Sequence, residues 1–315
     1  MSLKTAAKSL AELVHANLFS DFIPNNRLTR EGYQFFDLHV HLPLPKEHEV
    51  HDFLTRLTSQ VDGVTLAHYG RLQSGIETYD NIVQALKAAK PKDFSIKDKG
   101  LVTVVKDLET ERETLLFRSE EIDGTVQGLD IMLVGIKDFI PNPYQQFNYD
   151  ARKIADLGRA QGAFTYLEHF CAVESKILPF VLEKYNNKEK RKMLFDVMDY
   201  VDAIEVFNGH CVLWLPPQNV HSWELAREYN KSRGINKPFL YGSDVHLGLN
   251  AVGTAGILIP ALDSRLKDYE IIQQLSENIK KGIVDCKKDY NGLFSFIIQR
   301  RRLKQERERL KKQQA

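Results

Sequence analysis

The feature that most constrains the fold is a stretch at residues 35–42 (FFDLHVHL), in which apolar and polar side chains alternate. A period of two is typical of a β-strand, because successive side chains point to opposite faces of a sheet. The alternation puts Asp37, His39 and His41 on one face and apolar side chains on the other. Two imidazoles on one strand face lie close enough to bind a single cation. Pro43 then ends the predicted strand, because proline cannot donate to a β-ladder.

Strand-like runs alternate with helix-like segments along most of the chain. We expect strands at residues 61–67, 129–136, 163–167, 203–207, 238–241 and 256–259, and a hairpin formed by 101–105 and 114–117. We expect helices at residues 4–18, 47–59, 81–89, 149–161, 173–200, 221–232, 268–282 and 290–312. Strands that alternate with helices predict an α/β fold with a mostly parallel sheet, closed or doubly wound.

Polar residues of the kind that bind metals follow these apolar runs. They are His39, His41, His68, Glu121, His169, Asn208, Asp244 and His246. In a barrel of parallel strands the carboxyl ends meet at one edge, and the active site lies there. The spacing of Asp244 and His246 repeats that of His39 and His41. Imidazole and carboxylate together suit zinc, manganese or iron, so the sequence predicts a site for more than one metal ion.

The composition is that of an ordinary soluble protein. The chain has 315 residues, 43% hydrophobic and 27% charged, with a formal net charge of +1, which does not point to nucleic acid or membrane as a partner. No apolar run is long enough to span a membrane, and the N-terminus lacks the apolar core of a secretory signal. The three cysteines have no paired spacing, which indicates free thiols and a cytoplasmic location. Any metal must therefore be bound by histidine and carboxylate.

Three parts are expected along the chain. They are an N-terminal helical arm at residues 1–30, a barrel at 31–296 and a basic helical tail at 297–315. Positive and negative charges are mixed in the tail, which favours a solvated helix, with a nucleic-acid contact as the alternative. The oligomeric state is left open.

The motifs resemble the signatures of the PHP family, named for polymerase and histidinol phosphatase. The opening Asp-x-His-x-His stands at residues 37–41, and the closing Gly-Ser-Asp-x-His is complete at 242–246. The central signatures are similar in altered form, with Leu66-Ala67-His68 for Thr-Asp-His, Ser119-Glu120-Glu121 for Gly-x-Glu, Glu168-His169-Phe170 for Ala-His-Pro and residues 204–208 for Ile-Glu-x-x-Asn. The resemblance runs from about Tyr33 to Pro260. It implies a distorted (β/α)7 TIM-like barrel with a metal site at the C-terminal ends of the strands.

The resemblance also implies an activity, the hydrolysis of phosphate esters by a di- or trinuclear metal cluster and a metal-bound hydroxide. One metal would be bound by His39, His41, Glu121 and Asp244, its neighbour by His68 and His48, and a third by His169, His246 and Asp130. Asp130 stands where the family often has a histidine. Arg71 and Arg118 are candidates to bind the phosphate bidentately. The substrate would be a phosphorylated small molecule or a nucleic-acid end.

Two other functions are compatible with the sequence. An amidohydrolase-like metal hydrolase also carries His-x-His on its first strand, but it needs a lysine at the end of a middle strand, where only Lys137 stands. A degenerate PHP module would act in assembly or beside nucleic acid. Against it, the ligand-type residues are retained, and buried without a metal they would be costly.

Overall fold

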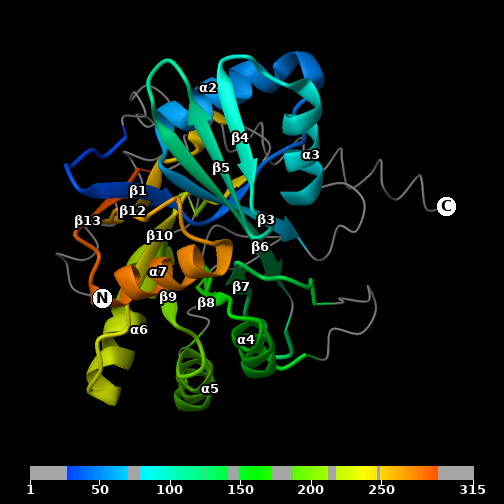
Figure 1. Ribbon diagram of the computed structural model, residues 1–315. Helices are drawn as coiled ribbons and strands as arrows, with labels where there is room; N and C mark the ends of the chain where they lie inside the picture. The colour runs from blue at the N-terminus through cyan, green and yellow to red at the C-terminus, as the bar shows by residue number, and fades with distance from the viewer. Residues whose placement is uncertain are drawn as a thin grey trace.

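The computed structural model describes residues 27–69, 79–123, 125–140, 149–171, 185, 187–211, 218–246 and 249–289. The fold is mixed α/β, and its centre is a nearly closed, barrel-like sheet (Figure 1). Nine strands form the main path of this sheet in the order β10-β9-β8-β7-β6-β3-β1-β12-β13. The two ends of the path approach each other, because β10 lies against β12 and β13.

The strands on the main path have the following bounds. They are β1 (Tyr33–Asp37), β3 (Gly63–Tyr69), β6 (Glu113–Ile122), β7 (Ile131–Val134), β8 (Phe164–Leu167), β9 (Ala203–Asn208), β10 (Phe239–Gly242), β12 (Ala255–Pro260) and β13 (Asp285–Lys288). The sheet continues beyond β6 through β5 (Val102–Asp107) and β4 (Phe94–Asp98). A separate two-stranded sheet pairs β2 (Val40–His41) with β11 (Val245–His246).

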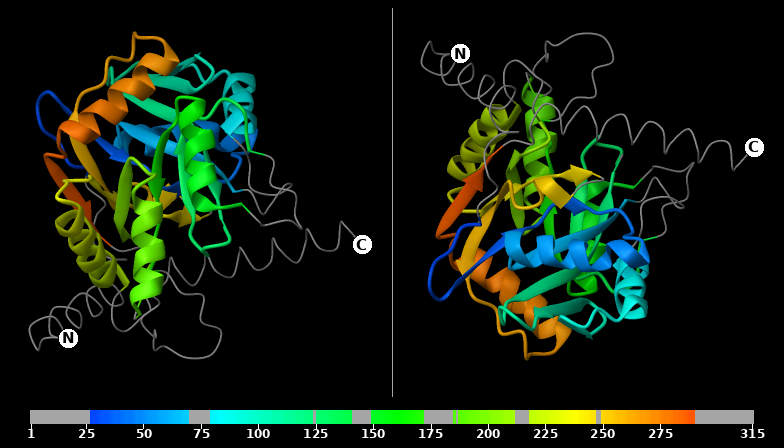
Figure 2. Two further views of the ribbon diagram at one scale, coloured as in Figure 1. Left: turned by 90° about the horizontal axis from the view of Figure 1, so that it is seen from below. Right: turned by 90° about the horizontal axis from the view of Figure 1, so that it is seen from above.

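Helices cover the sheet on two sides. With β4 and β5, α2 (Val50–Gln60) and α3 (Tyr79–Ala89) lie at the top of Figure 1. At the bottom are α4 (Ala151–Ala160), α5 (Lys188–Met198) and α6 (Gln218–Arg233), and α7 (Asp268–Lys281) crosses in front of the strands (Figures 1 and 2). Two short 3-10 helices, η2 (Glu47–Glu49) and η3 (Leu249–Ala251), lie in loops. None of the described helices is long and apolar enough to cross a membrane.

The apolar faces of these elements form two cores. One fills the barrel and the space beneath α4 to α7, and it includes Met132, Phe164 and Ile204. The other lies between α2, α3 and the outer face of the sheet, and it includes Leu57 and Leu116. Burial of alternate faces of the strands therefore explains why sequence periodicity located most elements.

The direction of the strands decides which residues reach the same edge. The parallel neighbours are β1, β3 and β6 in one group and β8, β9 and β10 in another. Between the groups, β7 runs antiparallel to both β6 and β8, and β12 runs antiparallel to β1. The amino end of β7 therefore lies beside the carboxyl ends of its neighbours. This reversal was not predicted.

Residues 35–42 do not form the single strand that the alternation predicted. The pairing of β1 with β3 ends at Asp37, and the chain then leaves the main sheet to form β2. The Asp37 carboxylate fixes the bend, since it accepts hydrogen bonds from the Ser243 hydroxyl, from the Ser243 amide at 3.0 Å and from the Gly253 amide at 2.8 Å. Two long-range partners thus override a local pattern.

Other elements differ less from the prediction. The strand expected at 129–136 begins only at Ile131, and β4 and β13 were not predicted. The helix expected at 173–200 is described from Lys188. The helices expected at 4–18 and 290–312, and with them most of the N-terminal arm and the whole tail, lie outside the described residues.

Candidate metal centre

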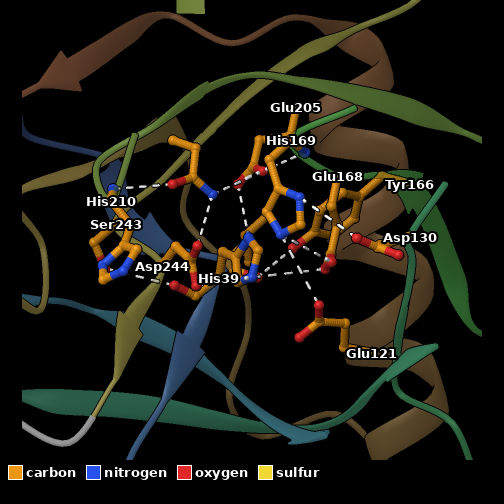
Figure 3. Close-up of polar contacts among 12 residues, drawn as sticks. His39, Glu121, Asp130, Tyr166, Glu168, His169, Glu205, His210, Ser243 and Asp244 are labelled. Atoms are coloured by element: carbon orange, nitrogen blue, oxygen red, sulfur yellow. Dashed lines mark hydrogen bonds and ion pairs between the residues drawn. The ribbon is translucent and has the colours of Figure 1, made fainter. Parts of the chain in front are cut away.

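The two-stranded sheet brings the first and last signatures together. In its register His41 lies beside His246, and their rings stack with centroids 4.6 Å apart. One residue before β11, the Asp244 amide donates to the His39 carbonyl at 2.8 Å. Both dyads of the sequence therefore meet in one buried site, and Figure 3 shows His39 and Asp244 side by side there.

His39 lies at the middle of this site, with 1% of its surface exposed. Its Nδ1 is 2.9 Å from Glu205 Oε1, so Nε2 is left to act as a ligand. Nε2 lies 3.4 Å from Asp244 Oδ1 and 3.9 Å from Glu168 Oε1. A carboxylate behind a histidine fixes the tautomer and orientation of the ring, which is the usual support for a metal-binding imidazole.

Glu121 and His169 approach His39 from two neighbouring regions of the sheet. Glu121 lies near the end of β6, with Oε2 3.0 Å from His41 Nε2 and Oε1 3.9 Å from His169 Nε2. His169 follows β8, and its ring stacks on that of His39 at 5.3 Å. Its backbone amide donates to Glu205 Oε2 at 2.9 Å, so one glutamate supports both histidines.

The donor atoms form two overlapping groups within the described part of the chain. One is His39, Glu121, Glu168 and His169, and the other is His39, His41 and Asp244. Within each group one donor atom per residue lies within 4.8 Å of every other. Since metal–ligand bonds are about 2.0–2.2 Å long, donors on opposite sides of a cation are about 4 Å apart. Each group therefore has the spacing that a cation requires.

Several of these donors have no hydrogen-bond partner among the described residues. They are His39 Nε2, Asp244 Oδ1 and both carboxylate oxygens of Glu168, all buried. Buried polar atoms are nearly always hydrogen-bonded, and a buried carboxylate without a partner is costly. Cations bound in the two groups would satisfy these atoms, so the residues present fit a metal centre.

Burial and mutual proximity shift the pKa values of the donors. Burial raises the pKa of Glu121 to about 7 and that of Glu168 well above its ordinary range. Burial also lowers the pKa of His41 to about 3 and that of His246 to about 4. Both histidines are therefore neutral at pH 7, the form in which imidazole binds metals.

Asp244 differs from the other carboxylates of the site. Burial alone would raise its pKa, but the neighbouring histidines, His39 first, hold the pKa far below the usual range. The Asn208 amide also donates to Asp244 Oδ2 at 3.1 Å. Asp244 is thus kept ionised, as a ligand must be.

Asp130 lies beside the site, but it precedes an antiparallel strand and does not lie within a strand as predicted. It precedes β7, and the reversed direction of that strand brings it to the edge where the other strands end. Its Oδ2 is 3.7 Å from Nδ1 of His169, the ring nitrogen that faces away from Glu121. The sequence interpretation grouped Asp130 with His169 and His246, whereas the ring of His246 stacks on that of His41.

The remaining candidates lie elsewhere or are not described. His48 is on η2 beside Glu49, and 76% of its side chain is exposed, so it is not part of the buried group. The backbone of His68 lies in β3, in register with Glu120. Arg71 lies outside the described residues.

Arg118 points away from the centre. It is three residues from Glu121 on β6, so the two side chains lie on opposite faces of the strand. Its guanidinium donates to Asp80 Oδ2 at 2.9 Å and to the Ile136 carbonyl at 3.2 Å, and it stacks over Phe139. Arg118 therefore binds parts of its own chain rather than facing the centre.

Four residues of the site were not assigned to a metal, although Asn208 stood among the polar residues that follow apolar runs. They are Glu168, Glu205, Asn208 and His210, whose ring lies 5.4 Å from that of His246. Each stands within or directly after an apolar strand run, the same signal that identified His169. Glu168 and Glu205 were interpreted only as parts of signatures. The sequence alone does not show which residues of a signature bind a metal and which only connect those that do.

Comparisons with known proteins leave the family open. No family model matches the sequence, and no curated protein matches it. Among solved structures, the chain aligns with a two-domain protein from Bacteroides vulgatus that contains a predicted PHP-like metal-dependent phosphoesterase. The alignment has 15% sequence identity and a TM-score of 0.46, and it covers 81% of this chain and 67% of the other. A likeness at this level does not establish a shared family.

Proposed function

We propose that this chain is a metal-dependent hydrolase of phosphate esters. The observation that carries the proposal is the buried group of imidazoles and carboxylates, several of whose donor atoms have no hydrogen-bond partner among the described residues. The resemblance of residues 37–41 and 242–246 to the PHP signatures favours phosphate esters over other substrates.

The finer parts of the proposal follow the same resemblance. They are a distorted (β/α)7 barrel, a cluster of two or three zinc, manganese or iron ions, and an arm and a tail that lie outside the chemistry. The two overlapping donor groups support at least one cation. Both groups include His39. The groups support two cations if His39 Nε2 binds the cation of one group and the other residues of the second group bind the second cation.

The residues of the chain would then have distinct roles. His39, His41, Glu121, His169 and Asp244 would hold the cations. When bound, divalent cations supply Lewis acidity toward a phosphoryl oxygen and lower the pKa of water.

Two residues behind these donors would keep them in place, and a third would contact the substrate. Glu205 fixes the Nε2 of His39 toward the centre, and Asn208 holds Asp244. His210 is half-buried beside His246, and its ring would bind a phosphate oxygen, the role predicted for the two arginines.

The two alternatives gain no support from the geometry. Lys137, the one candidate for the lysine of an amidohydrolase, is exposed after β7. Because β7 is reversed, that end of the strand lies at the edge opposite the centre. A degenerate module would carry buried, unpaired carboxylates without the cation that stabilises them.

The test combines metal analysis with an assay of phosphate esters. Protein purified without chelator should contain divalent metal, and with manganese it should hydrolyse members of a panel of phosphomonoesters and short oligonucleotides. Asp244→Asn keeps the shape of the side chain but removes a charged ligand, so turnover should fall at least about a hundredfold, as expected when charge stabilisation is lost. Asp62→Asn is the control, because this buried acid precedes β3 at the other edge and pairs with Arg27 at 2.7 Å. Protein that cannot be loaded with zinc, manganese or iron would refute the proposal.

A further inference from the structure

Glu168 occupies a position where the resembling signature, Ala-His-Pro, has alanine. It follows β8 directly and is fully buried, with 0% of its surface exposed. Neither carboxylate oxygen has a hydrogen-bond partner among the described residues. A buried glutamate that stands in place of alanine and whose carboxylate accepts no hydrogen bond requires an explanation.

Two other buried glutamates nearby, Glu205 and Glu120, do have hydrogen-bond partners. Glu205 bonds His39 Nδ1 with one oxygen and the His169 amide with the other. Glu120, on the opposite face of β6 from Glu121, accepts the Ile140 amide at 2.8 Å. The hydroxyl of the nearby Tyr166 donates to the Leu38 carbonyl rather than to Glu168. The environment of Glu168 therefore offers no structural role of the kind that its neighbours have.

The Glu168 carboxylate instead points at metal-type donors, as Figure 3 shows. Its Oε1 is 3.9 Å from His39 Nε2, and its Oε2 is 3.9 Å from His169 Nε2. Glu121 completes the group, in which all donor atoms lie within 4.8 Å of one another. These distances are too long for hydrogen bonds but suit donors that share a cation.

We propose that Glu168 is a metal ligand, and that with His39, Glu121 and His169 it forms a four-donor site that prefers manganese or iron to zinc. The inference rests on the proposed function and adds a ligand that the resembling signature does not include. The site has two nitrogen and two carboxylate donors, so it is richer in hard oxygen than a site with alanine here. Carboxylate oxygen suits manganese, whereas imidazole-rich sites suit zinc.

The decisive variant is Glu168→Met, which keeps the volume of the side chain and removes both oxygens. Manganese binding should weaken at least about tenfold, since the loss of residues behind ligands already costs roughly 10–100-fold. Zinc binding should weaken less, so the ratio of the two affinities should shift toward zinc. Titration of the variant with Mn²⁺, followed by the EPR signal of the free ion, and competition with Zn²⁺ measure both changes. Glu168→Gln, which keeps an amide oxygen, serves if the methionine variant does not fold.

Thermal melting adds a result that a structural role would not give. In the metal-free protein Glu168→Met should raise the melting temperature, because a buried carboxylate that accepts no hydrogen bond is replaced by an apolar group. In the manganese-loaded protein the same variant should melt below the wild type. Glu120→Met is the matched control, and it should lower the melting temperature in both states while leaving the ratio of affinities unchanged, because Glu120 holds the Ile140 amide.

The outcomes separate this inference from the proposed function. If the wild type binds manganese and both Glu168 variants bind it equally tightly, with an unchanged ratio to zinc, Glu168 is not a ligand and the proposed function stands. If metal-free Glu168→Met melts below the metal-free wild type, the carboxylate stabilises the fold and the inference is overturned. If the wild type binds no metal, the proposed function itself fails.

Discussion

At the scale of single residues, the centre depends on a glycine as well as on its histidines. Gly242 ends β10, and a Cβ atom there would lie 2.5 Å from Glu205 Oε1 and 2.5 Å from His39 Cβ. The hydrogen bond between Glu205 and His39 leaves no space for a methyl group. Two residues later Asp244 has a φ of +50°, a conformation that aspartate tolerates better than most residues. The glycine of the last signature is therefore a steric requirement of the centre.

We predict that Gly242→Ala lowers metal affinity at least about tenfold and unfolding free energy by about 1–3 kcal/mol, because the new methyl group displaces His39. Gly158→Ala is the control, since its Cβ would meet Leu133 Cδ2 at 2.5 Å, between α4 and β7 and away from the centre. It should cost similar stability and leave metal affinity unchanged. Metal titration and urea denaturation of both variants measure this. Unaltered metal affinity in Gly242→Ala would show that His39 is not held by this contact.

Asp130 contacts His169 on the ring nitrogen that faces away from the other donors. We therefore predict that Asp130→Asn weakens metal binding about 10–100-fold, as expected for a residue that orients a ligand, and leaves the number of bound ions unchanged. Elemental analysis at saturating metal gives the number, and titration gives the affinity. Asp138→Asn, an exposed change beyond the other end of β7, is the control. Loss of one bound ion in Asp130→Asn would instead make Asp130 a ligand, as the sequence suggested.

At the scale of elements, the bend between β1 and β2 positions the first signature. The Asp37 carboxylate accepts bonds from Ser243 and Gly253, which belong to the chain around β11 and β12. Ser243→Ala removes one of these bonds, and Asp37→Ala removes all of them and leaves both backbone amides without their acceptor.

We predict that Ser243→Ala costs about 1 kcal/mol of unfolding free energy and that Asp37→Ala costs about 3 kcal/mol or more, because buried donors are left without partners. Denaturant unfolding measures both costs. Equal costs for the two variants would mean that the hydroxyl, rather than the backbone amides, provides the stabilisation.

The sequence predicted elements better than it predicted their connections. Helices such as α2 and α7 were found because burial of one face imposes a period on the sequence, and strands such as β8 and β9, which are buried throughout, were found as short apolar runs. The break after Asp37 and the reversal of β7 were missed, because each is decided by partners far away in the chain. The same reason decides which site residues could be predicted. His39 and Asp244 stand in recognisable motifs, whereas only the structure shows that His48 is exposed and that Glu168 is buried without a hydrogen bond.

At the scale of the whole molecule, the donors come from strands on both sides of the barrel. Glu121 lies in β6, His169 lies just after β8, and Asp244 lies in the connection between β10 and β11. Cations bound by these donors would stabilise only the folded state, because the unfolded chain cannot bring the donors together.

We predict that loading with metal raises the unfolding free energy by about 2.7 kcal/mol when the free cation exceeds its Kd a hundredfold, and that a chelator reverses the effect. Differential scanning calorimetry across a range of metal concentrations measures the gain. It should be smaller in Asp244→Asn, which lacks one charged ligand. A melting temperature that does not respond to metal or chelator would contradict a centre built across the barrel.

The pairing of β2 with β11 has a consequence for the newly made chain. Asp37 and Ser243, which hold that pairing in place, are 206 residues apart in sequence. At about 5–20 residues per second, a ribosome needs roughly 10–40 s to make the distance between them. During that time the first two histidines have left the ribosome without the strand that completes their site. The growing chain therefore carries an unfinished centre, because the group of His39, His41 and Asp244 lacks its carboxylate until Asp244 has been made.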